Sequence, residues 1–152
     1  MDPTEQRTFP ARMAMLAQTA AFVETFCAAQ GVSPEDALRA VLVVEELFTN
    51  TVAHGHRGDS DAEVTLALTR MPNALALRYE DAAPPFDPLR RIDTAADTLS
   101  RPVEARPVGG LGIHLVGRYA SGARYAYEDG RNRLWLTLAV RRGAGAAPTG
   151  AG

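Results

Sequence analysis

The chain has 152 residues, which fits one domain that buries roughly two-thirds of its unfolded surface. Its 46% hydrophobic and 22% charged residues are those of an ordinary globular protein. The net charge is −2 and there is no lysine, so the basic stripe of a nucleic-acid-binding protein is missing. The single cysteine, Cys27, excludes an intramolecular disulfide, and its apolar neighbours predict a buried thiol. No apolar run could span a membrane and no signal peptide opens the chain, so we expect a cytoplasmic protein.

Two apolar helices are expected in the first third of the chain. Over residues 13–30, apolar side chains recur at helical spacing until Gly31 ends the pattern. Ser33 as the N-cap, Pro34 at the first helical position and an acidic residue three positions after the serine then start a second helix. This helix should end near Ala53. It is apolar nearly all round, which is typical of a helix packed between other elements.

Two later parts of the chain have the two-residue period of paired β-strands. In the first pair, a turn at residues 71–73 separates the strands, and a proline-rich loop over residues 81–88 follows. In the second pair, the strands flank Asp129-Gly130-Arg131-Asn132, a strong signal for a hairpin. The four expected strands cover residues 63–69, 75–81, 124–128 and 134–140.

Three segments lack a strand pattern. Residues 89–108 have no period and contain several arginines, which is typical of a functional lid or a disordered segment. A short apolar helix is expected over residues 113–120, and the small-residue tail over residues 142–152 is expected to be disordered. Residues 1–141 then form a single domain. The elements predict an α+β two-layer sandwich, in which a mixed or antiparallel sheet is covered on one face by about three helices.

Three polar side chains share one stripe of the second helix. Glu46, Asn50 and His54 are four residues apart, so they lie on one face of an otherwise apolar helix. A solvated edge would explain such a stripe, but the apolar neighbours favour a polar pocket. An amide oxygen suits Mg²⁺ and a carboxylate suits a general base, although the adjacent Glu45 competes with Glu46 for that role. His54, near the helix end, more often stabilises the helix dipole than binds a ligand.

Two further features fit a nucleotide pocket. Asp81 continues the apolar face of its strand, so its carboxylate points toward the core and needs hydrogen-bond donors. The loop that follows could supply these donors, as could the amino group of a bound purine. The turn Gly109-Gly110-Leu111-Gly112 opens a helix, where backbone N–H groups can hold phosphate. Glycines are also common in loops for backbone reasons alone, so the turn by itself is a weak signal for phosphate binding. The lid-like segment that precedes it strengthens this interpretation.

These segments, in this order, resemble the histidine-kinase-like (GHKL) ATPase superfamily, and most of all the stand-alone anti-sigma-factor serine kinases of bacterial partner switching. VVEELFTNTVAHGH corresponds to the N box, DAAPPFDP to the first glycine box and GGLGIHLV to the second glycine box. The ending YEDGRNRLWLTL resembles the closing hairpin of the subfamily. The resemblance covers about Phe9 to Val140, and three boxes in the family order are far more specific than any one of them.

The resemblance implies an ATP site with Mg²⁺, in which phosphoryl transfer depends on positioning and charge neutralisation. Glu46 would be the general base that activates a hydroxyl, Asn50 the Mg²⁺ ligand, and Asp81 the partner of the adenine amino group. The second glycine box would bring backbone amides to the phosphates under an ATP lid formed by residues 89–108. The ATP-binding residues implied in this way are Asn50, Asp81, Arg106, Gly110, Leu111 and Gly112.

One residue departs from the family pattern. The family usually has glycine two residues after the adenine-binding aspartate, and this chain has Ala83 there. If the backbone at this position needs a positive φ or a close approach to the base, alanine would strain the loop or weaken nucleotide binding.

The function expected from the resemblance is an ATP-dependent protein serine kinase that phosphorylates an anti-anti-sigma antagonist and sequesters a sigma factor. The alternative is a module that binds its partners, with or without nucleotide, and transfers no phosphate; Ala83 is its main support. The sequence does not separate sigma control from the same chemistry on another small protein. No helix bearing a phosphoacceptor histidine precedes the domain, so a sensor kinase is not expected. Relatives are often dimeric, and the apolar N-terminal helix would permit a homodimer.

Overall fold

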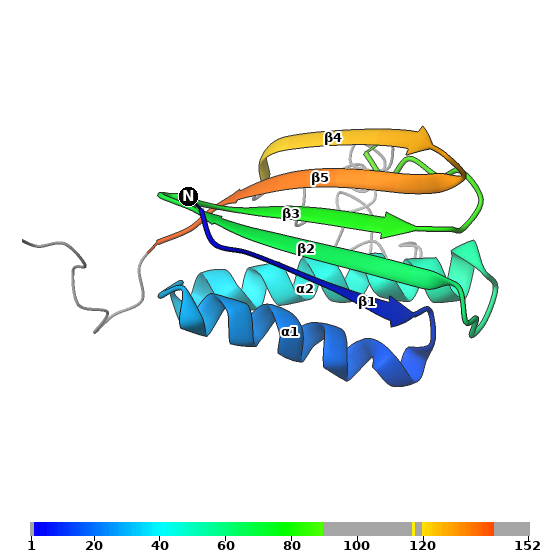
Figure 1. Cartoon of the computed structure of the whole chain (residues 1–152), viewed down its shortest axis with the longest axis horizontal. Helices are drawn as coiled ribbons and strands as arrows, with labels where there is room; N and C mark the ends of the chain where they lie inside the picture. The colour runs from blue at the N-terminus through cyan, green and yellow to red at the C-terminus, as the bar shows by residue number, and fades with distance from the viewer. Residues whose placement is uncertain (1, 90–116, 118–119, 142–152) are drawn as a thin grey trace, which may run out of the picture.

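A five-stranded antiparallel sheet with two helices on one face makes up the part of the chain that the structure, a computed structural model, describes: residues 2–89, 117 and 120–141 (Figure 1). The elements are β1 (Thr4–Pro10), α1 (Leu16–Ala29), α2 (Pro34–Asn50), β2 (Glu63–Met71), β3 (Ala74–Asp81), β4 (Ala120–Glu128) and β5 (Arg131–Ala139). The strand order is β1-β2-β3-β5-β4. The predicted α+β two-layer sandwich is therefore confirmed, with two of the three expected helices inside the described residues.

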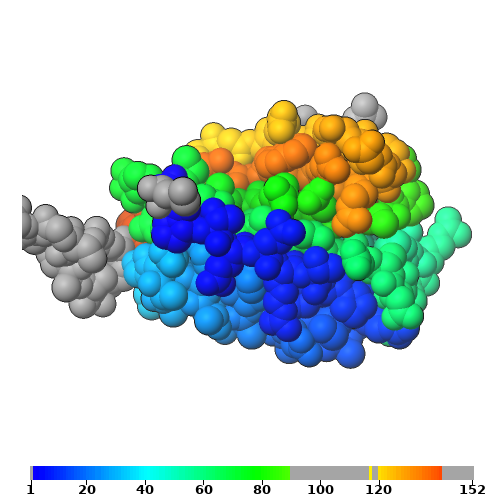
Figure 2. Space-filling model, in the orientation of Figure 1, coloured from blue at the N-terminus to red at the C-terminus, as the bar shows by residue number. Residues whose placement is uncertain are grey.

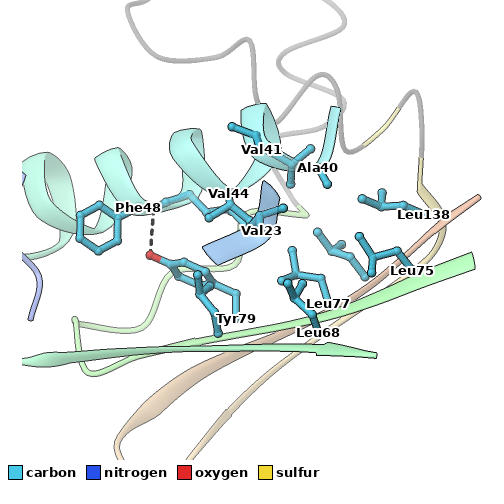
Figure 3. Close-up of a cluster of buried hydrophobic side chains, with 14 of the residues drawn as sticks. Val23, Ala40, Val41, Val44, Phe48, Leu68, Leu75, Leu77, Tyr79 and Leu138 are labelled. Atoms are coloured by element: carbon cyan, nitrogen blue, oxygen red, sulfur yellow. Dashed lines mark hydrogen bonds between the residues drawn. The ribbon is translucent and has the colours of Figure 1, made fainter. Parts of the chain in front are cut away.

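The core fills the space between the helices and the inner face of the sheet (Figure 3). Alternate residues of the central strands point toward α1 and α2, as the two-residue period predicts. On the face seen in Figure 2, the side chains of β1 lie directly against those of α1. Cys27 is fully buried, as expected. The fully buried large side chains are Phe9, Val23, Phe26, Val43, Val44, Phe48, Val52, Leu66, Leu68, Leu75 and Leu136.

Local sequence signals fix the ends of both helices. At the end of α1, Gly31 adopts a φ of 70°, and the next amide, of Val32, donates a 3.0 Å hydrogen bond to the carbonyl of Cys27. At the start of α2, the side chain of Ser33 accepts a 3.2 Å hydrogen bond from the amide of Asp36, with proline at the first helical turn. The predicted glycine stop and serine cap are both confirmed.

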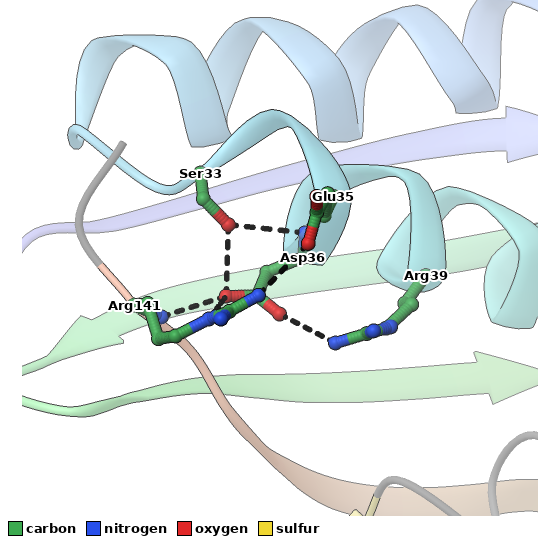
Figure 4. Close-up of polar contacts among 5 residues, drawn as sticks. All are labelled: Ser33, Glu35, Asp36, Arg39 and Arg141. Atoms are coloured by element: carbon green, nitrogen blue, oxygen red, sulfur yellow. Dashed lines mark hydrogen bonds and ion pairs between the residues drawn. The ribbon is translucent and has the colours of Figure 1, made fainter. Parts of the chain in front are cut away.

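A buried carboxylate joins the start of α2 to the end of β5 (Figure 4). Asp36 is 4% exposed and accepts hydrogen bonds from the hydroxyl of Ser33 at 2.9 Å, the amide of Arg141 at 2.7 Å and the guanidinium of Arg39 at 2.9 Å. Burial by itself raises the pKa of Asp36, but these hydrogen bonds and the two positive charges outweigh it, so the pKa is lowered. Residue 141, just beyond β5, is thereby fixed to the helix layer.

Strand β1 was not predicted from the sequence. It pairs with β2 at the edge of the sheet, and Phe9 is its one buried residue. Its other inward positions, Glu5 and Arg7, are charged and exposed, and Arg7 donates a 3.4 Å hydrogen bond to Gln18 of α1, so the strand lacks the apolar alternation of a half-buried strand. β1 is therefore an edge strand that is recognised by its pairing with β2 and not by a sequence pattern of its own.

The second hairpin is longer than predicted. Asp129 (φ 54°) and Gly130 (φ 75°) form a two-residue turn with both residues left-handed, the geometry that an Asp-Gly pair favours. β5 therefore begins at Arg131, so Asn132 belongs to the strand and not to the turn. β4 begins at Ala120, which corrects the expected helix end at that residue; of residues 113–119, only Gly117 is described, and it is helical.

Among the described residues, no helix is long and apolar enough to cross a membrane. The expected disordered tail, residues 142–152, lies outside the described residues.

Candidate functional site

A cavity of about 330 Å³ lies at one end of the core, between the C-terminal end of α2 and the strands β3 and β5. Its volume is within the usual range of small-molecule sites. Four parts of the fold line it: the end of α2, the turn that follows, the end of β3 with its loop, and the β4–β5 hairpin. The lining residues are Leu47, Asn50, Thr51, His54, Gly55, Arg57, Tyr79, Asp81, Ala83, Pro84, Pro85, Phe86, Pro88, Tyr125, Asn132 and Leu134.

The helix expected to run to Ala53 changes character at Thr51. Residues Thr51–Gly55 form a π-helical turn, in which the amide of His56 donates a 2.9 Å hydrogen bond to the carbonyl of Thr51. Wider turns of this kind are frequent at functional sites, because they reorient the side chains of a helix end. Here the π turn brings Thr51, His54 and Gly55 to the wall of the cavity beside Asn50.

Asp81 lies at the last position of β3, 7% exposed, with its side chain on the inner face as the alternation predicts. Its Oδ1 accepts hydrogen bonds from the side-chain amide of Asn132 at 2.8 Å and from the backbone amide of Ala83 at 3.1 Å. Its Oδ2 accepts a 2.8 Å hydrogen bond from the hydroxyl of Thr51. A carboxylate has about four acceptor positions, so within the described part of the chain these three donors leave one of them, on Oδ2.

A chain of hydroxyl groups orients that carboxylate from the helix side. The hydroxyl of Tyr79 lies 2.6 Å from that of Thr51. It also lies 3.2 Å from the carbonyl of Leu47 on α2, the contact that is dashed in Figure 3. Burial, with the charge of Asp81 adding to it, raises the pKa of Tyr79 well above its usual value, so this phenol keeps its proton. Because the carboxylate can only accept, Thr51 donates to Asp81 and can accept a hydrogen bond from the hydroxyl of Tyr79.

Asn132 joins the two sides of the cavity and was missed from the sequence, which placed it in a turn. Its side-chain nitrogen donates to Asp81 and to the carbonyls of Ala83 at 3.0 Å and Pro84 at 3.1 Å. Its side-chain oxygen accepts a 2.9 Å hydrogen bond from the amide of Phe86. The signal that could have found it is its place two residues before Leu134, on the apolar face of β5.

The hydroxyl of Tyr125 on β4 donates to the same oxygen of Asn132. Burial raises the pKa of Tyr125, so the phenol stays protonated and remains a donor at neutral pH. Every donor and acceptor of the Asn132 side chain is therefore engaged, and this amide holds the loop after β3 in one position.

The predicted stripe on α2 is only partly assembled at the cavity. Asn50 lines it, and among the described residues its side-chain nitrogen is buried without a hydrogen-bond partner. Glu46 lies one turn earlier, half-buried, with its Oε1 shielded from solvent; it is not among the lining residues. Glu45 is half-buried too, so burial does not decide between the two glutamates. His54 lines the cavity from the π turn.

Ala83 is not strained. Among the described residues other than glycine, only Arg57 and Asp129 have a positive φ, so the backbone at Ala83 does not need glycine. The side chain is 4% exposed and packs toward the π turn, where a Cβ on Gly55 would lie 2.8 Å from the Cβ of Ala83. The expected need for a positive φ at this position is therefore absent, and alanine does not strain the backbone of the loop.

The other predicted site residues lie outside the described residues. These are Arg106, Gly110, Leu111 and Gly112, together with residues 90–108 of the expected lid. The assignments of these residues to the phosphates remain predictions.

The sheet order, the single helix-covered face and the cavity between α2 and the end of β3 define an α+β domain with a site of small-molecule size. The family model described as "Histidine kinase-like ATPase domain" matches residues 9–138, and the chain belongs to this family. The membership predicted from the three sequence boxes is thereby confirmed.

The curated relatives that match are bacterial protein kinases. The serine-protein kinase RsbW of Listeria monocytogenes serotype 4a (strain HCC23) is 27% identical over 90 residues, which cover 59% of this chain and 57% of the relative. The serine/threonine-protein kinase BtrW of Bordetella bronchiseptica is 26% identical over 96 residues, 63% of this chain and 66% of the relative. The chain therefore matches less than two-thirds of the length of each.

Two solved structures share the fold. One, with the RsbU and RsbW domains of Rv1364c from Mycobacterium tuberculosis, has a TM-score of 0.64 and 18% identity; the match covers 92% of this chain and 33% of that chain. The other, the SiaB–SiaC complex from Pseudomonas aeruginosa, has a TM-score of 0.63 and 16% identity, with 88% of each chain covered. At these identities the likeness concerns the fold alone.

Proposed function

We propose that this protein is an ATP-dependent protein serine kinase of bacterial partner switching, which phosphorylates an anti-anti-sigma antagonist and sequesters a sigma factor. The observation that carries the proposal is the cavity that brings Asp81 and Asn50 together, at the positions where the family resemblance puts base and metal recognition. The kinase names of the curated relatives support the class of reaction.

The adenine binds at Asp81 in this proposal. The free acceptor position on Oδ2 suits the amino group of adenine, because the other three positions are taken by donors of the protein. Those three hydrogen bonds hold the carboxylate in place before the nucleotide arrives, so little ordering is needed on binding. The apolar side chains of Leu47 and Leu134 offer surfaces for the purine ring.

The phosphate end of the nucleotide lies toward Asn50. The side-chain oxygen of Asn50 would hold Mg²⁺, which usually takes only one or two protein ligands in addition to phosphate oxygens and waters. The buried amide nitrogen without a partner fits a residue whose surroundings are completed by a ligand. When bound, the ion neutralises the charge of the phosphates. The backbone of Gly110, Leu111 and Gly112 and the side chain of Arg106 would complete the phosphate contacts.

Glu46 is the general base in this proposal. It accepts the proton of the substrate serine while the serine oxygen attacks the γ-phosphorus and the bond from that phosphorus to the ADP oxygen breaks. Its position on α2, one turn before Asn50 and therefore on the same face of the helix, supports a base near the metal end of the site. Its Oε1 is shielded from solvent, which favours proton transfer from a bound hydroxyl group to the carboxylate over exchange with water.

The test is transfer of labelled phosphate from ATP to a co-encoded antagonist protein. Glu46→Ala should lower the transfer rate by about 10²- to 10⁴-fold, the usual contribution of a general base. Glu45→Ala is the matched control and should keep the rate within about threefold, since this residue has no role in the proposed step. The opposite pattern would move the base to Glu45.

Calorimetry separates the kinase from the binding module without phosphate transfer. Wild-type protein titrated with Mg-ATP should show saturable binding. No binding at millimolar nucleotide would refute the kinase and leave a protein-interaction module. Binding without transfer to any co-encoded antagonist would support a nucleotide-binding module of the same fold. Size-exclusion chromatography with light scattering on the same samples tests the expected homodimer.

A further inference from the structure

The π turn and the loop after β3 approach each other at Gly55 and Ala83. A Cβ on Gly55 would lie 2.8 Å from the Cβ of Ala83, closer than two carbons can pack. The next atom it would meet, the carbonyl oxygen of Asn50, is 3.8 Å away, an ordinary contact. Gly55 does not have a left-handed φ, so its backbone accepts any residue. The methyl group of Ala83 is therefore the one obstacle to a side chain here among the described residues.

Both segments are tied to the carboxylate of Asp81, so neither can retreat freely. On the loop side, the amide of Ala83 donates to Asp81 at 3.1 Å and its carbonyl accepts from Asn132 at 3.0 Å. On the helix side, Thr51 opens the π turn and donates to Asp81 at 2.8 Å. The amide of Gly58 closes the turn with a 2.8 Å hydrogen bond to the carbonyl of Val52.

We propose that Gly55 and Ala83 are a steric pair that positions Asp81 for recognition of the nucleotide base. One methyl group fills the space between the two segments and sets their spacing. A second methyl group forces the loop away, which disturbs the donors on Asp81 and the acceptor position left for the base. The proposal rests on the proposed ATP site and names two positioning residues in it, neither of which carries a functional group.

The pair is tested with four forms of the protein: the wild type, Gly55→Ala, Ala83→Gly and the double variant that exchanges the two residues. We expect Gly55→Ala to raise the Kd for Mg-ATP by roughly tenfold or more, because an added methyl in a packed site shifts its neighbours. The exchange should bring the Kd back to within about threefold of the wild type, since it restores one methyl between the segments. Gly122→Ala is the matched control: its new Cβ would meet Thr137 no closer than 3.7 Å.

A second readout separates positioning from general loss of stability. Purine riboside triphosphate lacks the amino group that Asp81 would accept, so the wild type should prefer ATP to this analogue. In Gly55→Ala that preference should largely vanish, and in the exchange variant it should return. A variant that is merely less stable would have a lower melting temperature and an unchanged preference, which would overturn the positioning role.

The melting temperatures of the same four forms without nucleotide test the steric coupling of Gly55 and Ala83 independently of ATP binding. A loss in Gly55→Ala that the exchange removes supports the pair, even where Gly55→Ala is too unstable to assay. Additive effects, or a Gly55→Ala form that behaves like Gly122→Ala, overturn it. If the wild type binds no ATP, the proposed function and the base-positioning role both fail, while these melting temperatures still decide whether the two residues are sterically coupled.

Discussion

The side-chain amide of Asn132 donates a 2.8 Å hydrogen bond to Oδ1 of Asp81, its direct neighbour across the antiparallel pair of β5 and β3. The two residues are 51 positions apart in the chain. The same amide also holds the carbonyls of Ala83 and Pro84. Asn132 is thus the residue through which the last strand fixes both the carboxylate and the loop of the cavity.

Removing that amide should weaken nucleotide binding. Asn132→Ala removes one of the three donors to Asp81 and the donor to two loop carbonyls, so we expect the Kd for Mg-ATP to rise by roughly 10- to 100-fold, or about 1–3 kcal/mol. Asn132→Asp should bind still more weakly, because two carboxylates would face each other. Isothermal titration calorimetry at pH 7 measures both. Asn73→Ala, at an exposed asparagine in the β2–β3 turn, is the control and should bind as the wild type does. Equal affinity in Asn132→Ala would refute the role.

Loss of the Thr51 hydroxyl should cost stability. Thr51→Val keeps the shape of the side chain, but it removes the donor to Oδ2 of Asp81 and the closer of the two partners of the Tyr79 hydroxyl. Buried polar groups left unsatisfied destabilise a fold, so the free energy of unfolding should fall by about 1–3 kcal/mol in urea titrations. Thr51→Ser restores the hydroxyl and should recover most of this loss. If Thr51→Val were as stable as the wild type, the hydroxyl of Thr51 would make no net contribution to the free energy of unfolding.

Asp36 should make the protein sensitive to acid. Its pKa is lowered in the folded state, so its stabilising contribution is complete above the unfolded pKa near 4 and disappears as the pH falls through the lower, folded value. At pH 7, Asp36→Asn should lower the free energy of unfolding by about 1–3 kcal/mol. The difference between the two proteins should shrink below about pH 4.

Thermal melting from pH 7 to pH 2 checks this prediction. Asp61→Asn is the matched control, because Asp61 also pairs with an arginine, Arg12 at 2.7 Å, but is 82% exposed. Exposed ion pairs contribute little to stability, so this variant should melt as the wild type does. A constant difference between wild type and Asp36→Asn across the whole range would exclude an ionic contribution from Asp36.

Cys27 should be unreactive in the folded protein. Burial raises the pKa of its thiol to about 11, so almost no thiolate exists at pH 8, and the side chain is fully covered. Ellman's reagent should therefore label the native protein only at the rate of unfolding. The same protein in guanidinium chloride should react at once, which serves as the control. Rapid labelling of the native form would show that α1 opens without global unfolding.

The parts of the fold that were predicted are those with local signals. The serine and proline at the start of α2, the glycine after α1 and the Asp129-Gly130 turn each determine backbone geometry within a few residues. β1 was missed because an edge strand with one buried residue has no apolar pattern of its own. The exact start of β5 was missed because Arg131 and Asn132, which directly follow Gly130, are residue types found both in turns and in strands.

The same distinction applies to the cavity. Asp81 and Asn50 could be placed from the sequence, since each is a polar residue at an apolar position of its own element. Thr51 and Asn132 could not, because their importance comes from contacts across the fold, with β3 and with the loop after it. The π turn was also beyond prediction, since no local residue pattern distinguishes it from the end of an α-helix. The effect of alanine at position 83 could not be predicted either, because it depends on the close approach of Gly55, which the sequence does not show.

The tight β4–β5 turn has a consequence for how this protein can change over evolution. Asn132 is only two residues beyond Gly130, so the turn sets which face of the sheet it occupies. Because side chains alternate across a strand, one inserted or deleted residue would turn Asn132 outward and bring Arg131 or Arg133 to face Asp81. The length of this hairpin is therefore constrained by the cavity, although the hairpin lies far from the N box in the sequence.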